Sequence, residues 1–401
     1  MSTSLQTPLR HLLLLAAAIS MGAAVSLGIT RFAYGLLLPA MRTDLGWSYT
    51  LAGGMNTANA MGYFLGALAT PWLMRRVGPS TLLWAGALLA SVFMGLSGFF
   101  VESGPLLVQR LLAGVASATV FIAGGLLAAR LGARAPQHGG LLLGLYYGGT
   151  GVGIVLSALV VPWALEVTQT QAHGWRWAWW GLALVCVLAS GLLRWPAKVM
   201  AAWPQPEAPA DTAHMVFRWQ QFRYALAAYT LFGVGYIGYM TFVVALLRAQ
   251  GSTALAVTVF YALLGLAVMA SSRIWAGLLD RHQGGRAMAT LNALLGLATV
   301  LPALTQSWPV VLASGLLFGA VFLSVVASTT ALVRHNLPPS AWASGISAFT
   351  VVFAAGQIVG PTVVGWIADG PGGLARGLVF SAVALWLGAL LAFQQKAVQS
   401  A

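Results

Sequence analysis

Long apolar runs recur along almost the whole chain, and each is long enough to cross the roughly 30 Å hydrocarbon core of a bilayer. Their continuous hydrophobicity favours helices, because the strands of a membrane barrel would alternate apolar and polar residues. The sequence therefore predicts an all-α membrane protein with twelve transmembrane helices. The predicted spans lie near residues 12–40, 50–73, 80–100, 105–130, 138–165, 176–194, 222–247, 253–279, 286–306, 308–333, 340–368 and 374–395.

Charged residues are scarce, at 7% of the 401 residues, whereas a soluble domain carries about a quarter. The net charge of +13 could suggest nucleic-acid binding. However, most Lys and Arg residues stand singly or in pairs between apolar runs, as in the loops of membrane proteins. We therefore expect the lipid bilayer as a partner and no nucleic acid. The single cysteine, Cys186, excludes an internal disulfide and a cysteine-based metal cluster, and we expect no cofactor or metal.

The basic residues also predict an orientation. With the N-terminus inside, thirteen Lys and Arg residues fall on the inner face. Four fall on the outer face, namely Arg42, Arg176, Arg248 and Arg376. Since cytoplasmic loops are enriched in positive charge, both termini are predicted to be cytoplasmic.

The chain divides near its middle. The polar stretch Trp195–Gln220 contains four prolines and is typical of a tether. An offset of 205 residues indicates weak internal symmetry, because it places Gly28, Arg31 and Tyr34 on Gly233, Tyr236 and Tyr239. The predicted units are an N-terminal six-helix bundle (1–195), a cytoplasmic linker (196–220) and a C-terminal six-helix bundle (221–401).

Several motifs resemble those of the major facilitator superfamily. The sequence is similar to that family in the loop with Asp280 and Arg281, in the fourth-helix segment 110–114, and in the eleventh-helix segment 356–361. The segment 28–39 resembles the YbfB/YjiJ-type branch. The resemblance implies two pseudo-symmetric six-helix bundles in a bacterial inner membrane, alternating access and no enzymatic activity. It also implies conformational or coupling roles for Arg110, Asp280 and Arg281.

Three arginines lie inside predicted spans, namely Arg31, Arg110 and Arg273. A charge at a membrane helix centre costs about 3 kcal/mol, so each needs a partner or an aqueous cavity. No acidic residue lies well inside a span, so a substrate anion is the natural partner. We predict that Arg31 and Arg273 are the anion clamps. The alternative for Arg31 is bonding to backbone carbonyls or hydroxyls. The alternatives for Arg273 are extension to the interface and pairing with Asp280, and the alternative for Arg110 is extension to the interface.

Polar side chains in the middle of other spans are further candidates. Tyrosine, asparagine and glutamine can donate hydrogen bonds to an anion, and aromatic rings can flank an organic body. Ordinary hydrogen bonding between helices is the alternative for each of them. The predicted substrate contacts are Tyr34, Tyr147, Tyr236, Tyr239 and Gln357, and related positions are Tyr146, Asn56 and Asn59.

We therefore predict a secondary active transporter, expected to be monomeric, that moves a small organic anion such as a carboxylate by alternating access. A proton-coupled drug or metabolite efflux pump is an alternative, although exporters of cationic drugs usually need a membrane carboxylate. A polytopic membrane enzyme is a second alternative. It would require an acid–base pair, nucleophile or metal cluster that the spans do not contain.

Overall fold

The computed structural model describes residues 9–203, 218–338 and 341–398, and no strand occurs in these ranges. Eleven helical segments among them are long and apolar enough to cross a membrane. The remaining predicted span, 50–73, forms a helix of 29 residues that carries more polar side chains. The predicted all-α membrane fold is therefore confirmed.

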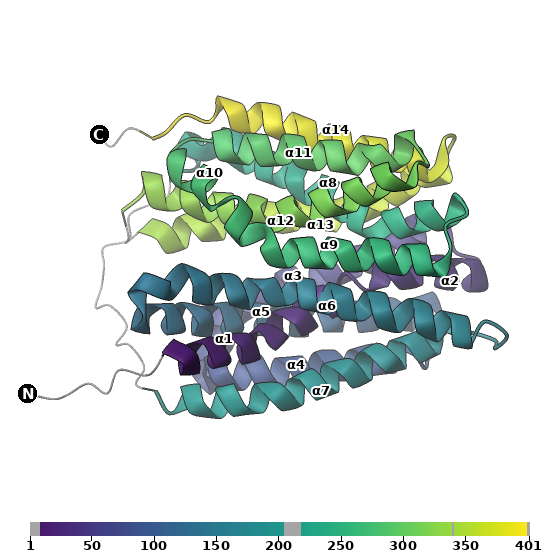
Figure 1. Ribbon diagram of the computed structural model, residues 1–401, viewed down its shortest axis with the longest axis horizontal. Helices are drawn as coiled ribbons and strands as arrows, with labels where there is room; N and C mark the ends of the chain where they lie inside the picture. The colour runs from purple at the N-terminus through teal and green to yellow at the C-terminus, as the bar shows by residue number, and fades with distance from the viewer. Residues whose placement is uncertain (1–8, 204–217, 339–340, 399–401) are drawn as a thin grey trace, which may run out of the picture.

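The helices form two bundles, one above the other in Figure 1, that follow each other in the sequence. The first bundle contains α1 (Leu9–Ala23), η1 (Ala24–Ile29), α2 (Tyr34–Leu45), α3 (Tyr49–Val77), α4 (Pro79–Ser97), α5 (Ser103–Arg134), η2 (Pro136–His138), α6 (Gly139–Val167) and α7 (Trp175–Ala201). The second contains η3 (Trp219–Phe222), α8 (Arg223–Ala249), α9 (Ala254–Ile274), α10 (Ala276–Arg281), α11 (Arg286–Leu304), α12 (Trp308–Asn336), α13 (Trp342–Asp369) and α14 (Gly373–Gln394).

The two ends of the molecule can be named from the chain direction. The start of α1 and the end of α14 lie at the same end, which we call the termini end (Figure 1). The connections α2–α3, α6–α7, α8–α9 and α13–α14 lie at the opposite, far end. The positive-inside pattern predicts that the termini end is cytoplasmic. Of the predicted linker, residues 196–201 continue α7, and residues 204–217 lie outside the described residues.

Two predicted spans are interrupted. The first consists of α1, the π-helix η1, a turn at residues 30–33, and α2. η1 lies very close to α6, since a Cβ atom on Gly28 would come within 2.6 Å of the Gly153 Cα. The glycine at position 28 is therefore required by this crossing. The second interrupted span divides at Trp275 into α9 and α10.

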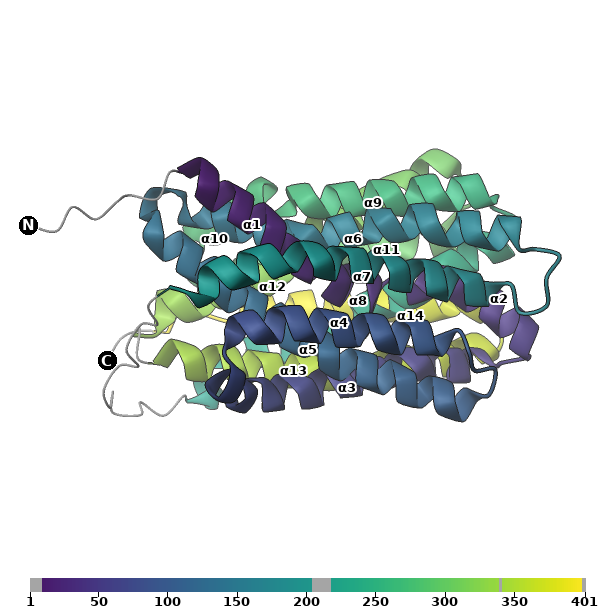
Figure 2. The ribbon, with the colours of Figure 1, turned by 90° about the horizontal axis from the view of Figure 1, so that it is seen from below.

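The bundles meet mainly along two pairs of helices, α3 with α13 and α6 with α9. Figure 2 shows α3 and α13 side by side, and α6 next to α9. Glycines allow the close approach in both pairs. Gly53 faces the Pro361 carbonyl, and Gly151 faces Gly265. Such small residues let membrane helices approach closely, and here they build the seam between the bundles.

Candidate functional site

Arg31 lies in the turn between η1 and α2, in the interior of the molecule. Its side chain is 2% exposed, and its Nε and Nη2 atoms are buried without a hydrogen-bond partner. The π-helix and turn bring this about locally, because the backbone bonds shift there from the α-helical spacing, as in the bond from the Phe32 amide to the Leu27 carbonyl (3.1 Å). Arg31 is thus a buried cation with free donors at a helix interruption.

Two tyrosines lie near this guanidinium group, and a glutamine is bonded to one of them. The Arg31 Cζ atom is 5.4 Å from the ring centroid of Tyr63 on α3. The Tyr236 hydroxyl on α8 lies within electrostatic range of the Arg31 charge. That hydroxyl donates a 2.8 Å hydrogen bond to the Oε1 atom of Gln357 on α13. The Arg31 cluster, defined as Arg31, Tyr63, Tyr236 and Gln357, therefore combines side chains from both bundles.

Three of these four residues were predicted from the sequence, and Tyr63 was missed. It stands in the middle of the predicted span 50–73, so its position carried the same signal as the tyrosines that were selected.

Aromatic rings hold Tyr236 in place. Its ring is stacked on those of Phe232, Phe353 and Phe322, with centroid separations of 4.9, 5.6 and 6.1 Å. The interplanar angles of these three pairs are 20° or less. This packing fixes the direction of the Tyr236 hydroxyl. One ring of the stack, Phe353, is only partly buried.

Arg110 on α5 is also buried, at 2% exposure, rather than extended to the interface. Its Nη1 atom donates to the Thr30 carbonyl (2.7 Å), and its Nη2 atom donates to Asn56 Oδ1 (2.9 Å). Asn56 in turn donates to the Thr241 hydroxyl on α8 at 2.7 Å. Arg110 therefore supports the interrupted first span and connects it to the second bundle.

The other predicted tyrosines lie apart from Arg31 or use their hydroxyls internally. Tyr34 donates to the Ala52 carbonyl (2.8 Å) and lies beside Arg110. Tyr239 shares a 2.7 Å hydrogen bond with the Ser314 hydroxyl. Tyr147 is partly buried, packs on Tyr146, and lies within electrostatic range of Tyr63. Of these three tyrosines, Tyr147 is the one that interacts with a member of the Arg31 cluster, Tyr63.

The structure does not bring Arg273 into this cluster. Tyr261 on α9 donates to the Phe32 carbonyl (2.8 Å), next to Arg31. Arg273 follows twelve residues later on the same helix, which is about 18 Å further toward the termini end. Its side chain is exposed there. Asp280 and Arg281, in α10, are exposed at the same end.

No carboxylate neutralises the interior arginines within the described ranges. The described acidic residues all lie at helix ends or in connections, namely Asp44, Glu102, Glu166, Asp280 and Asp369. Arg31 and Arg110 lie within electrostatic range of each other, so like charges are held close together. Two positive charges thus lie in the interior without an opposite charge among the described residues, next to side chains from both bundles.

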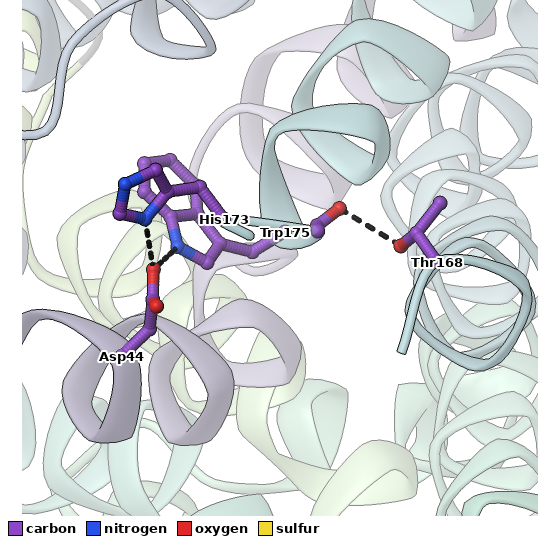
Figure 3. Close-up of polar contacts among 5 residues, drawn as sticks. Asp44, Thr168, His173 and Trp175 are labelled. Carbon is purple, nitrogen blue, oxygen red and sulfur yellow. Dashed lines mark hydrogen bonds and ion pairs between the residues drawn. The ribbon is translucent and has the colours of Figure 1, made fainter. Parts of the chain in front are cut away.

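A separate pocket of about 910 Å³ opens at the far end between the bundles. In its wall, Asp44 Oδ2 accepts a 2.6 Å hydrogen bond from Trp175 Nε1 and lies 2.6 Å from His173 Nδ1 (Figure 3). Thr168 donates nearby to the Gly174 carbonyl at 3.0 Å. These contacts tie α2 to the α6–α7 connection within the first bundle.

Solved membrane transporters share this fold. A bacterial homologue of the human lysosomal transporter Spinster, in an inward-facing and unoccupied conformation, has a TM-score of 0.66 at 16% identity, over 96% of this chain and 97% of that one. The nucleoside transporter NupG has a TM-score of 0.63 at 13% identity, over 96% and 98% of the two chains. The Escherichia coli fucose:proton symporter FucP has a TM-score of 0.61 at 15% identity, with the same coverage. At these identities the likeness shows the fold alone.

Sequence comparisons identify the family. The inner membrane metabolite transport protein YgcS of Escherichia coli (strain K12) is 26% identical over 204 residues, which make up 50% of this chain and 44% of that protein. The match thus spans less than half the length of YgcS. A family model described as "Uncharacterised MFS-type transporter YbfB" matches residues 23–393. The chain therefore belongs to the YbfB-type transporter family of the major facilitator superfamily.

Proposed function

We propose that the protein is a secondary active transporter of a small organic anion, a carboxylate, and that Arg31 binds the anion. The buried guanidinium group with two unpaired nitrogen atoms carries this proposal. A buried charge without a partner is costly, and such a charge inside a membrane protein usually marks a substrate site. A carboxylate would supply both the opposite charge and the acceptors for two parallel hydrogen bonds.

The chemistry around Arg31 supports an anion rather than a cation or a sugar. Arg110 adds a second positive charge within electrostatic range, and no described carboxylate offsets either one. The Tyr236 hydroxyl and the Gln357 amide offer further hydrogen-bonding groups from the second bundle. An anion bound here would contact both bundles, which is the arrangement that an alternating-access transporter needs.

The same pattern argues against a proton-carrying carboxylate of the protein in the middle of the membrane. All described acidic residues lie at helix ends or in connections. The remaining coupling modes are exchange of one anion for another, and symport of a proton that the substrate brings. In an exchanger, the empty site would reorient slowly because two uncompensated cations would have to move with it.

The pocket at the far end does not include Arg31 in its lining, and the positions of the hydrogen bonds between the bundles support a state that is closed between this pocket and Arg31. Among the described residues, these bonds lie between the level of Arg31 and the far end, as in the pairs Tyr261–Phe32 and Thr57–Ile358. With the termini in the cytoplasm of a bacterial inner membrane, this state is inward-facing.

Transport into proteoliposomes tests the proposal. Liposomes containing the purified protein are loaded with or without an internal carboxylate and then given a radiolabelled mono- or dicarboxylate, with and without a pH gradient. Uptake that saturates and is faster with internal anion supports anion exchange. Uptake of nucleosides, sugars or organic cations, with no uptake or binding of any carboxylate, would refute the assignment of substrate class.

A further inference from the structure

Helix α3 begins at the far end with its first amide groups bonded to the other bundle. The Asp369 carboxylate accepts hydrogen bonds from the Tyr49 amide (2.7 Å), the Thr50 amide (2.8 Å) and the Thr50 hydroxyl (2.6 Å). The next amide, of Leu51, donates to the N-cap residue Ser48 at 3.1 Å. The N-terminus of a first-bundle helix is therefore capped by the last residue of α13, in the second bundle.

The helix dipoles explain why this carboxylate bonds across the seam. At the end of its own helix, Asp369 lies where the dipole disfavours a negative charge. At the start of α3 the dipole and the unpaired amides favour one. Arg42 on α2 adds a positive charge within electrostatic range of Asp369, and its Cζ atom lies 3.7 Å from the ring centroid of Tyr49. Among the described residues, the attractive partners of this carboxylate thus belong to the first bundle.

Close backbone contacts continue the seam below this cap. Gly365 on α13 faces the Tyr49 carbonyl, and Gly53 on α3 faces the Pro361 carbonyl. One turn further, the Thr57 hydroxyl donates to the Ile358 carbonyl at 2.7 Å. Separation of the bundles at the far end must break the bonds of Asp369 first, because this residue lies outermost along the α3–α13 pair.

We propose that Asp369 is a latch that holds the far end closed by capping helix α3. The proposal rests on the transport function proposed above, since such a latch acts only in a protein whose bundles separate alternately at the two ends. Asp369 is exposed, and Tyr49 and Thr50 are partly buried, so water can replace the bonds among them when the latch opens. The closed state is thus favoured without being locked permanently.

Asp44 provides a matched control. It also lies at the far end and also accepts hydrogen bonds through its carboxylate, from Trp175 and His173. Those partners belong to the same bundle as Asp44. Asp44→Asn therefore removes a similar charge and similar bonds, and none of those bonds joins the two bundles.

The experiment measures distances between spin labels on the full-length protein in liposomes, without substrate. The buried Cys186 is first replaced by serine. One label pair, at Thr170 and Gln306, spans the far end. A second pair, at Gln137 and Gln283, spans the termini end. All four side chains are exposed, and each pair joins the two bundles.

Asp369→Asn should raise the ratio of far-end-open to far-end-closed molecules by ~10-fold, since three hydrogen bonds to a charged acceptor are weakened in the closed state only. The second pair should then report shorter distances. Asp44→Asn should leave both distributions unchanged. An unchanged distribution in Asp369→Asn, or an equal shift in Asp44→Asn, would overturn the latch. Because no substrate is added, a wrong substrate assignment does not affect this result.

Discussion

Arg110 donates a 2.7 Å hydrogen bond from Nη1 to the carbonyl oxygen of Thr30, the residue directly before Arg31. One buried arginine thus satisfies a backbone group exposed by the interruption of the first span, while the next residue of that turn presents an unpaired guanidinium group. The two side chains share a neighbourhood and have different roles. The two Nη atoms of Arg110 support the local fold, whereas Nε and Nη2 of Arg31 have no hydrogen-bond partner.

Substitution of Arg31 should abolish tight anion binding. Removal of one partner of a buried charge pair costs at least about 2 kcal/mol, so Arg31→Ala should weaken carboxylate binding by ~30-fold or more. Arg31→Lys should lose ~10-fold or more, because an ammonium group cannot form two parallel hydrogen bonds to a carboxylate. Isothermal titration of the purified variants measures both values. Near-normal affinity in Arg31→Lys would indicate that only the charge matters.

Replacement of Arg31 by an apolar residue should not destabilise the empty protein. Arg31→Met removes an unpaired buried charge, so the unfolding midpoint without ligand should stay the same or rise. Arg110→Met leaves the Thr30 carbonyl and the Asn56 amide oxygen without their donor, which should cost about 2 kcal/mol and lower the midpoint. Thermal unfolding followed by tryptophan fluorescence compares the two variants. The reverse order of midpoints would contradict the roles assigned here.

Arg273 should influence the rate of anion arrival more than affinity. It is exposed about 18 Å along α9 from the level of Arg31, so Arg273→Ala should change the carboxylate dissociation constant by less than ~2-fold. The rate of binding from the termini end should fall and become less sensitive to salt, because a long-range attraction has been removed. Stopped-flow measurements at low and high ionic strength give both quantities. A large loss of affinity would indicate that Arg273 contacts the bound anion, and would contradict this prediction.

The hydroxyl of Tyr236 should contribute modestly to binding. Tyr236→Phe keeps the aromatic stack and removes one neutral hydrogen bond, so affinity should fall by ~5-fold, or about 1 kcal/mol. Tyr239→Phe, on the same helix, is the control, because the charge of Arg31 acts on the Tyr236 hydroxyl, whereas the Tyr239 hydroxyl interacts with Ser314. Binding titrations of both variants check this. Equal losses of affinity would mean that the effect is general to α8.

The sequence by itself determined the membrane fold and the isolation of the interior arginines. Hydropathy is a sum over neighbouring residues, so long apolar runs identify spans without knowledge of tertiary contacts. The absence of acidic residues from the spans can likewise be read position by position. Arg31, Tyr236 and Gln357 could therefore be selected in advance as candidates for one site.

Only the tertiary structure decided which polar groups are already paired. The sequence could not show that Arg110 bonds to a carbonyl 80 positions away, or that Asp369 caps a helix that begins 320 positions earlier. It could not show that α9 carries Arg273 well beyond the level of Arg31. Hydrogen bonds act over about 3 Å, so their partners follow from how helices cross and at what height, which local composition does not encode.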